Sequence, residues 1–187
     1  YCTEDGKVKS VGTESKAGLM SPKNLLVTTI GDELKLNTNQ QAKVFSISLK
    51  DRSSILPAGH SANGAFWFDG SNGKFISSSH YMNELPAWVN EFNSLQLAKT
   101  YLSQGWNTLY PIAGYTESIA DKNNYEAAPN KKDTAIFPYQ YNAQLEKNNY
   151  EIIKATPFGN TITKDLALAC LKAEQLGKGK QTDMLCI

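Results

Sequence analysis

A short apolar run that ends in two cations constrains the fold of this chain most. Residues 43–49 are predicted to form a strand, because their side chains alternate in size from one face to the other. One face carries large apolar side chains, those of Phe45, Ile47 and Leu49. The other face carries the small side chains that close packing against a helix requires, those of Val44, Ser46 and Ser48. A strand of this kind indicates a sheet covered by helices.

Helices are predicted on both sides of this strand. Ser21 and Pro22 provide an N-cap and a first helical position, and that helix should fade near residues 37–39. Its apolar stripe recurs at steps of four, at Leu26, Ile30 and Leu34. After the strand, Ser53 or Ser54 can cap a short helical turn. The order helix, strand, helix is typical of an α/β sheet.

The middle of the chain predicts a different kind of structure. Residues 65–77 have the pattern of a β-hairpin around a Gly- and Asn-rich turn at 69–73. Two helical pieces follow, one from Pro86 and one over 95–102, and residues 114–150 are expected to be irregular. Seven aromatic side chains here could stack on a sugar or a base, or form a small core: Phe66, Trp67, Phe68, Phe75, Tyr81, Trp88 and Phe92. The core interpretation is favoured, because aromatic residues dominate core packing.

The C-terminal part returns to the α/β pattern. Residues 156–160 are expected to form a loop, and Thr163 to cap a helix that ends near Gly177. Residues 184–187 are predicted to restart a core strand. Since ordinary proteins rarely stop inside such a strand, we expect the sequence to be an excerpt of a longer polypeptide.

Composition and motifs argue against several classes of function. The net charge is +1 with both signs interspersed, and no run of 18 apolar residues occurs. Neither a nucleic-acid surface nor a membrane span is therefore expected. His60 and His80 belong to no metal-binding pattern, and the three cysteines form no CxxC motif. No metal is expected to bind within this chain, and Cys170 and Cys186 are expected to be buried structural thiols.

Lys50 and Arg52 are the candidate functional residues. If the strand continues straight to residue 52, their side chains emerge on the same side, at the end of the strand where α/β proteins gather ligands. An arginine fork and a lysine point charge suit a phosphoryl or sulfuryl group. The alternative is a solvated strand end with a local contact to Asp51. The pattern alone favours that alternative.

Four ordered blocks of sequence carry a specific resemblance. They are SLKDRSSILPAGH at 48–60, GAFWFDGSNGKFISSSHYMNELPAWVNEFN at 64–93, GWNTLYPI at 105–112 and TPFGNTIT at 156–163. Together they resemble the bacterial alkaline phosphatases of the phosphate-irrepressible, periplasmic type, which belong to the alkaline phosphatase superfamily. The resemblance covers essentially the whole chain.

The resemblance implies an internal fragment of a two-zinc enzyme that hydrolyses small-molecule phosphate monoesters. In that family a Thr or Ser nucleophile lies between two Zn²⁺ ions held by Asp and His residues, and these groups are expected outside this chain. Lys50 and Arg52 are implied to contact the oxygens of the transferred phosphoryl group. Without a nucleophile and zinc ligands, the excerpt alone is expected to be inactive. The parent protein is implied to be periplasmic or secreted.

The implied fold is a partial alkaline-phosphatase-like α/β sandwich with a mixed α+β cap insertion. Residues 1–60 would be a core segment ending in the SLKDR block, 61–155 the cap, and 156–187 a truncated return to the core. The incomplete core sheet would expose unpaired edges, so the excerpt is expected either to self-associate or to be partly disordered at its ends.

Two alternative functions remain open. The parent could be a nucleotide pyrophosphatase/phosphodiesterase or a sulfatase of the same superfamily. A third interpretation, from another class, is a non-catalytic module that binds a glycan or a protein, which would require exposed Trp67 and Trp88.

Overall fold

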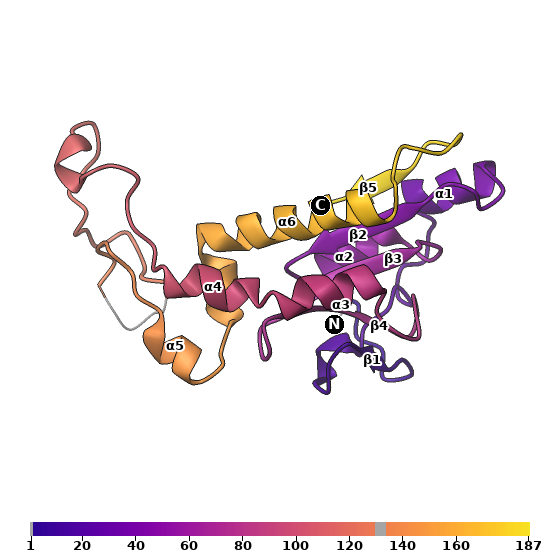
Figure 1. Cartoon of the computed structure of the whole chain (residues 1–187), viewed down its shortest axis with the longest axis horizontal. Helices are drawn as coiled ribbons and strands as arrows, with labels where there is room; N and C mark the ends of the chain where they lie inside the picture. Colours follow the sequence, from indigo (N-terminus) through magenta and orange to yellow (C-terminus); the bar gives the residue numbers. More distant parts are fainter. Residues whose placement is uncertain (1, 130–133) are drawn as a thin grey trace.

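A five-stranded mixed sheet lies at the centre of the molecule, in the order β1-β4-β3-β2-β5 (Figure 1). The structure, a computed structural model, describes residues 2–129 and 134–187. Its strands are β1 (Ser10–Val11), β2 (Val44–Ser48), β3 (Gly64–Asp69), β4 (Lys74–Ser78) and β5 (Met184–Cys186). The interior strand β2 pairs in parallel with β3 and with β5, whereas β4 pairs antiparallel with β3 and with β1.

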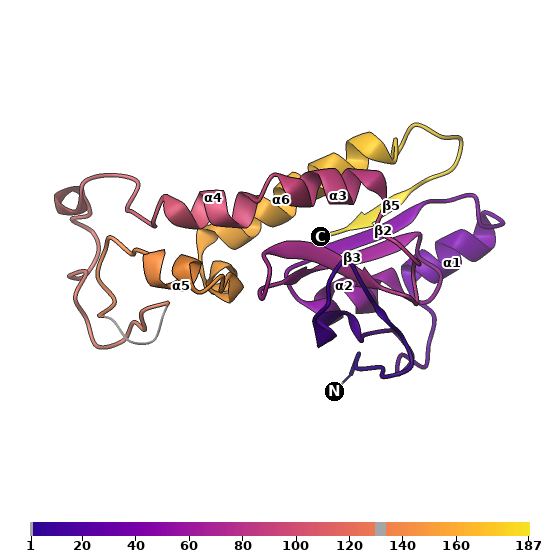
Figure 2. The same ribbon diagram turned by 60° about the horizontal axis from the view of Figure 1, so that its bottom comes forward.

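Helices cover both faces of this sheet (Figure 2). They are α1 (Ile30–Asn37), α2 (Asp51–Ala58), α3 (Ala87–Ser94), α4 (Leu97–Ser103), α5 (Asn142–Glu146) and α6 (Pro157–Ala173), with short 3₁₀ turns η1 (Lys16–Gly18), η2 (Ile112–Gly114) and η3 (Glu151–Ala155). Figure 2 shows α1 and α2 on one side of the sheet and α3 and α6 on the other. The predicted α/β class is therefore confirmed. Residues 105–129 and 134–149, called the arm, extend beyond the sheet (Figure 1).

The smaller core lies between α2 and the sheet. Ile55 and Ala58 of α2 pack against Trp67 of β3 and Ile76 of β4, and all four are buried. The indole Nε1 of Trp67 donates a hydrogen bond to the Ala17 carbonyl at 2.9 Å. The N-terminal segment is thereby tied to this face of the sheet.

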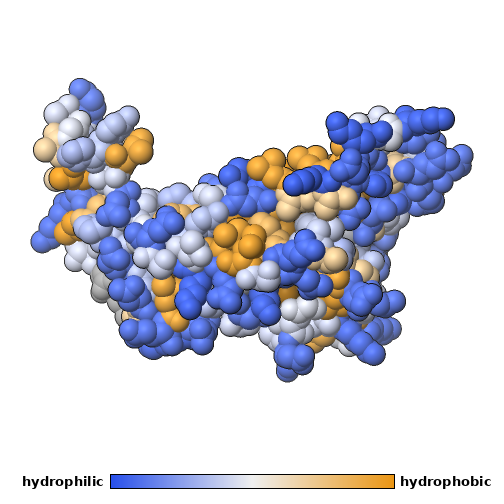
Figure 3. All heavy atoms as spheres, viewed as in Figure 1, coloured by the Kyte–Doolittle hydropathy of each residue, from blue (hydrophilic) through white to orange (hydrophobic). Residues whose placement is uncertain are grey.

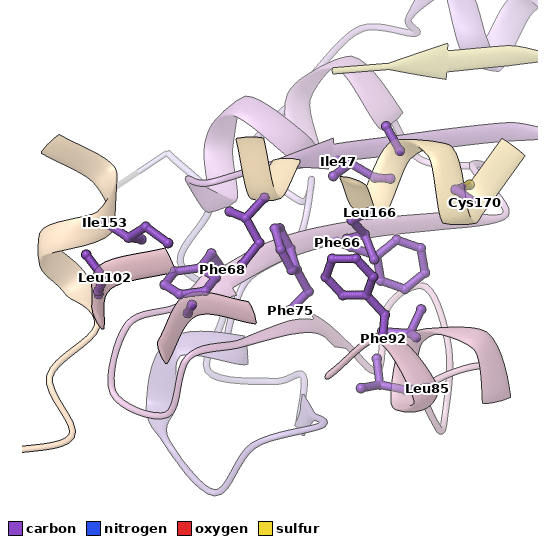
Figure 4. Close-up of a cluster of buried hydrophobic side chains, with 14 of the residues drawn as sticks. Ile47, Phe66, Phe68, Phe75, Leu85, Phe92, Leu102, Ile153, Leu166 and Cys170 are labelled. Carbon is purple, nitrogen blue, oxygen red and sulfur yellow. The ribbon is translucent and has the colours of Figure 1, made fainter. Parts of the chain in front are cut away.

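The larger core fills the opposite face (Figure 4). Phe66 and Phe68 of β3 belong to one buried cluster with Phe75 of β4, Phe92 of α3 and Leu166 of α6. The rings of Phe68 and Phe75 meet edge to face, with centroids 5.5 Å apart, as do those of Phe75 and Phe92 at 6.0 Å. The interpretation of these aromatic residues as core is confirmed.

The predicted hairpin is present, and it belongs to the same sheet as β2. Strand β3 pairs with β2 in a register that joins Phe45 to Gly64 and Ser48 to Trp67. The 61–155 segment therefore contributes two strands to the sheet before the chain leaves it at α3. The assignment of 1–60, 61–155 and 156–187 to core and cap within a longer protein stays a prediction.

The sequence prediction is wrong at the start of the first helix. The chain forms turns from Ser21 onward, and α1 begins only at Ile30. Leu26 is 92% exposed and Ile30 is 78% exposed, so the expected apolar stripe does not face the core. The start signal is instead a capping box, in which Thr29 and Asp32 bond each other's backbone N–H groups.

The prediction is also wrong at the start of α6. Residues 156–160 form no loop, because Thr156 is the N-cap and Pro157 the first residue of the helix. Proline suits that position, because the backbone N–H of the first helical residue has no acceptor within the helix and proline has no N–H. Thr163 lies within the helix, and its hydroxyl donates to the Gly159 carbonyl at 2.8 Å.

A buried carboxylate holds the loop between α2 and β3. Asp32 is 3% exposed, and its Oδ1 accepts hydrogen bonds from the backbone N–H groups of His60 and Ser61 at 2.9 and 2.8 Å. Gly59 is required beside it, because its φ is +72° and a Cβ there would lie 2.3 Å from Asp32 Oδ2. Burial alone would raise the pKa of Asp32, but hydrogen bonds from Ser61 and Thr29 outweigh burial and hold that pKa below its ordinary value.

Replacing Asp32 with Asn should lower the free energy of unfolding by about 2 kcal/mol at neutral pH, because a donor group then faces other donors. Since the folded-state pKa is lowered, the carboxylate contributes fully above an unfolded pKa of about 4. That contribution is lost as the pH falls through the folded pKa, so the difference between the two proteins should shrink in acid. Urea unfolding of both proteins across this pH range measures it. A difference that stays constant would contradict the role of Asp32.

Candidate functional site

The junction between β2 and α2 presents the two cations expected to be functional. Strand β2 ends at Ser48 and α2 begins at Asp51, so Lys50 is the N-cap and Arg52 lies in the first helical turn. Both side chains are exposed. The prediction that the strand runs straight to residue 52 is wrong, because the chain turns into a helix after Lys50. Lys50 and Arg52 are called the cation pair below.

Hydrogen bonds fold α2 back over β2 at this point. The backbone N–H of Ser54 donates to the Lys50 carbonyl at 3.2 Å. The Ser54 hydroxyl donates to the Ser46 carbonyl at 3.0 Å, from the helix to the strand. The small side chains predicted for this face of β2 allow the helix to approach so closely. The cation pair is therefore attached to a buried strand on one side and to a packed helix on the other.

The cation pair lies just past the carboxyl end of β2. In open α/β sheets this edge is where ligands gather. The first-turn residue Asp51 lies between the two cations, and Arg52 and Asp51 each have partners within the chain. The local contact that the alternative interpretation expects is thus compatible with the structure.

The carboxyl end of β3 carries a buried carboxylate that sequence reasoning missed. Asp69 is 3% exposed, and its Oδ2 accepts hydrogen bonds from the hydroxyls of Thr13 and Ser15, both at 2.7 Å. Its Oδ1 accepts from the backbone and hydroxyl of Ser71. Burial would raise the pKa of Asp69, but these hydrogen bonds outweigh it and lower that pKa. Asp69 is a structural anchor between the hairpin turn and the N-terminal segment, and the Asp-Gly-Ser sequence is a turn signal that could have indicated it.

In the described part of the chain, both histidines make contacts that hold the loop after α2. His60 donates its backbone N–H to Asp32, and its carbonyl lies 3.2 Å from Nε2 of His80. Within residues 2–129 and 134–187, no group of three or more His, Cys, Asp or Glu side chains could hold a metal ion. Over the same ranges, we find no helix with the length and apolar character needed to cross a bilayer.

Neither Cys170 nor Cys186 offers an activated nucleophile. Cys170 is fully buried, and burial raises the pKa of its thiol to about 12. Such a thiol is not ionised at neutral pH and is unreactive. Cys186 is half-buried, and burial raises its pKa as well. The expectation of a buried thiol is confirmed for Cys170 and only partly met for Cys186.

Trp67 and Trp88 do not form an exposed binding platform. Trp67 is 2% exposed, and Trp88 is half-buried with its Nε1 donating to Glu174 Oε1 at 2.8 Å. The glycan- or protein-binding interpretation requires both side chains to be exposed. That requirement is not met.

Comparison with known proteins gives a consistent result across the whole chain. No family model matches it. The chain is 51% identical, over all 187 residues, to the alkaline phosphatase PhoV of Synechococcus elongatus, and it covers 34% of that protein. The crystal structure of wild-type alkaline phosphatase PafA superimposes with a TM-score of 0.93 at 48% identity, covering 100% of this chain and 36% of that one. Over its whole length, the chain matches an internal segment of these alkaline phosphatases.

The match is to a segment of the family's proteins, because the chain spans about a third of the length of the curated relatives it matches. PafA of Elizabethkingia meningoseptica is 47% identical over 188 residues, and the chain covers 34% of that protein. A protein of Myroides odoratus that is 50% identical, with the same coverage, carries the name calcium-transporting ATPase. The predictions of family and fold class are confirmed.

One further solved structure bears on the cation pair. It is a PafA variant that superimposes with a TM-score of 0.94 at 46% identity, covering 100% of this chain and 36% of that one. It carries a Thr-to-Ser substitution and substitutions of an Asn, a Lys and an Arg to Ala. Its substituted Lys and Arg are two positions apart.

Proposed function

We propose that this chain is an internal segment of a zinc-dependent alkaline phosphatase, in which Lys50 and Arg52 stabilise the oxygens of the phosphoryl group that is transferred. One observation carries the proposal. The PafA variant has a Lys and an Arg replaced at a spacing of two. Arg52 is the only arginine in this chain, so Lys50 and Arg52 form its only Lys-x-Arg pair. Because the match covers the whole chain, Lys50 and Arg52 are the residues that correspond to the substituted pair in this proposal.

The chemistry of the pair suits a phosphate monoester. A monoester dianion has three non-bridging oxygens, which need donors while charge redistributes in the transition state. The guanidinium of Arg52 can hold two of them through parallel N–H groups, and Lys50 adds a compact charge. A diester has lost one of those charges, so it gains less from the same pair. The substrate is accordingly a small-molecule phosphate monoester, with no nucleic-acid partner.

Two Zn²⁺ ions would supply Lewis acid chemistry and activate the nucleophile when bound. The residues described here offer no ligand group for them, which supports placing the ligands in other segments of the parent. In the PafA variant the substituted Thr and Asn precede the Lys by more than 60 positions, and 49 residues precede Lys50 here. Their counterparts would thus lie before Tyr1. A periplasmic or secreted location fits such a phosphatase.

A nucleotide pyrophosphatase/phosphodiesterase or a sulfatase of the same superfamily is the second candidate. The cation pair argues against a diesterase, because a diester offers one oxygen charge fewer. A sulfatase would carry a Cys or Ser that becomes formylglycine in a segment before this chain. The names of PhoV and PafA favour the phosphatase.

Replacing Arg52 with Ala in the full-length parent should lower kcat/KM for an aryl phosphate monoester by about a hundredfold, the upper range for a lost charge-assisted hydrogen bond. Hydrolysis of an aryl phosphate diester should change much less. Steady-state kinetics on both substrates measure the two effects. Lys178→Ala is the matched control, because Lys178 is an exposed lysine near the amino ends of β2 and β5. Equal losses on monoester and diester would refute the assigned role.

The 187-residue chain alone should show no phosphatase activity, because the proposed nucleophile and zinc ligands belong to other segments. An assay with an aryl phosphate and added Zn²⁺ checks this expectation. Turnover above the rate measured in buffer with Zn²⁺ alone would contradict the expectation.

The isolated chain should self-associate through its β5 edge. Strand β5 pairs only with β2 among the described strands, and Figure 3 shows apolar surface where Figure 1 draws α6 and β5. Leu168 and Leu171 of α6 and Ile187 after β5 are exposed apolar residues. An open edge beside apolar surface favours pairing between copies. Sedimentation velocity should show association that rises with concentration and weakens in Leu168→Glu. A monomer at every accessible concentration would contradict this.

A further inference from the structure

A close contact joins the start of α6 to the residue before Lys50. Leu49 is half-buried and packs against the larger core. Gly159, in the first turn of α6, is buried beside it. A Cβ on Gly159 would lie 2.7 Å from Leu49 Cδ1 and 2.9 Å from the Ile153 carbonyl oxygen. Both distances are shorter than real Cβ contacts, so any side chain at position 159 forces a neighbour to move.

Glycine at this position is not explained by backbone conformation. Gly159 lies within a regular helix and is not among the glycines with positive φ. Inside a helix, glycine destabilises the structure relative to alanine. The close approach of Leu49 and of the Ile153 carbonyl is the structural reason that remains.

The segment before α6 is itself held at the carboxyl edge of the sheet. The backbone N–H of Tyr150 donates to the Gly70 carbonyl at 2.8 Å, and the Tyr150 ring covers Gly73. Ile153 of η3 is fully buried in the larger core, and Figure 4 places it beside Leu102 at that end of the cluster. Residues 150–159 thus pack against the β3–β4 turn and against Leu49 together.

We propose that Gly159 is a positioning residue for phosphoryl transfer. Its missing side chain lets Leu49 pack against α6, and this contact fixes the β2–α2 junction that carries Lys50 and Arg52. The start of α6 is thereby coupled to the cation pair through one apolar contact. This inference rests on the proposed function of the pair.

The test uses Gly159→Ala in the full-length parent. The new methyl group requires Leu49 Cδ1 or the Ile153 carbonyl to move, and we expect the movement of Leu49 to shift the cation pair that follows it. A misplacement of about 1 Å can cost a hundredfold in rate, so we expect kcat/KM for an aryl phosphate monoester to fall by about tenfold or more. The diester rate should change by less than about threefold on the same reasoning.

A double-mutant cycle separates positioning from packing. In a Lys50→Ala/Arg52→Ala background, Gly159→Ala should cause no further loss of monoesterase activity, because the groups it positions are absent. Gly114→Ala is the matched control and should leave both activities unchanged, since a Cβ there meets nothing within 4 Å. If Gly159→Ala does not fold, Leu49→Ala removes the same contact without a clash and should give the same selective loss.

Two results would overturn the inference. One is an equal loss on monoester and diester, and the other is an undiminished loss in the Lys50→Ala/Arg52→Ala background; either means that Gly159 serves packing alone. The inference fails by itself when Arg52→Ala is selective for monoesters and Gly159→Ala is not. It fails together with the proposed function when Arg52→Ala shows no selectivity.

Discussion

The burial of β2 on both faces and its pairing along both edges form the constraint on which the rest of the structure depends. Val44 and Ile47 are completely buried, and the strand pairs in parallel with β3 on one side and β5 on the other. Parallel neighbours require crossover connections, and α2 supplies the one from β2 to β3. In this chain only Leu49 and Lys50 separate β2 from the first turn of α2. The cation pair lies at this turn because nothing longer separates strand from helix.

The elements that the sequence predicts correctly are those where periodicity and turn chemistry agree. The hairpin combines alternating apolar residues with a Gly- and Asn-rich turn, and Asp69 closes that turn as an acceptor for Ser71. The second helical piece is also found, as α4, and Gly105 after its C-cap has a φ of +68°. In each case a local pattern and a local backbone requirement point to the same structure.

The errors arise where a residue matches a local sequence pattern but makes its main contact with a residue that is distant in the sequence. Ser21 has the composition of an N-cap, but its hydroxyl donates to the buried Asp5 carboxylate at 2.6 Å and so ties two parts of the N-terminal segment. The Pro-Phe-Gly-Asn run resembles a turn, yet Gly159 is helical and packs against Leu49. No local pattern could reveal that contact, because its two residues lie far apart in the sequence.

The candidate site shows the same division between local and long-range information. Resemblance identifies Lys50 and Arg52, whereas the strand periodicity used to align their side chains does not apply, because α2 begins at Asp51. What fixes their position is the Ser54–Ser46 hydrogen bond and the contact of Leu49 with α6. Both depend on tertiary packing of small residues against a buried strand.

The affinity of the full-length parent for inorganic phosphate tests the central claim most directly. Phosphate presents the oxygens of a monoester without a leaving group, so the change in its inhibition constant when the pair is replaced measures how much the cation pair contributes to binding those oxygens, apart from the chemical step. The account predicts that Lys50→Ala/Arg52→Ala raises this constant by at least about tenfold, the lower range for charge-assisted hydrogen bonds. An unchanged inhibition constant in a variant that still binds its metal ions would contradict the account.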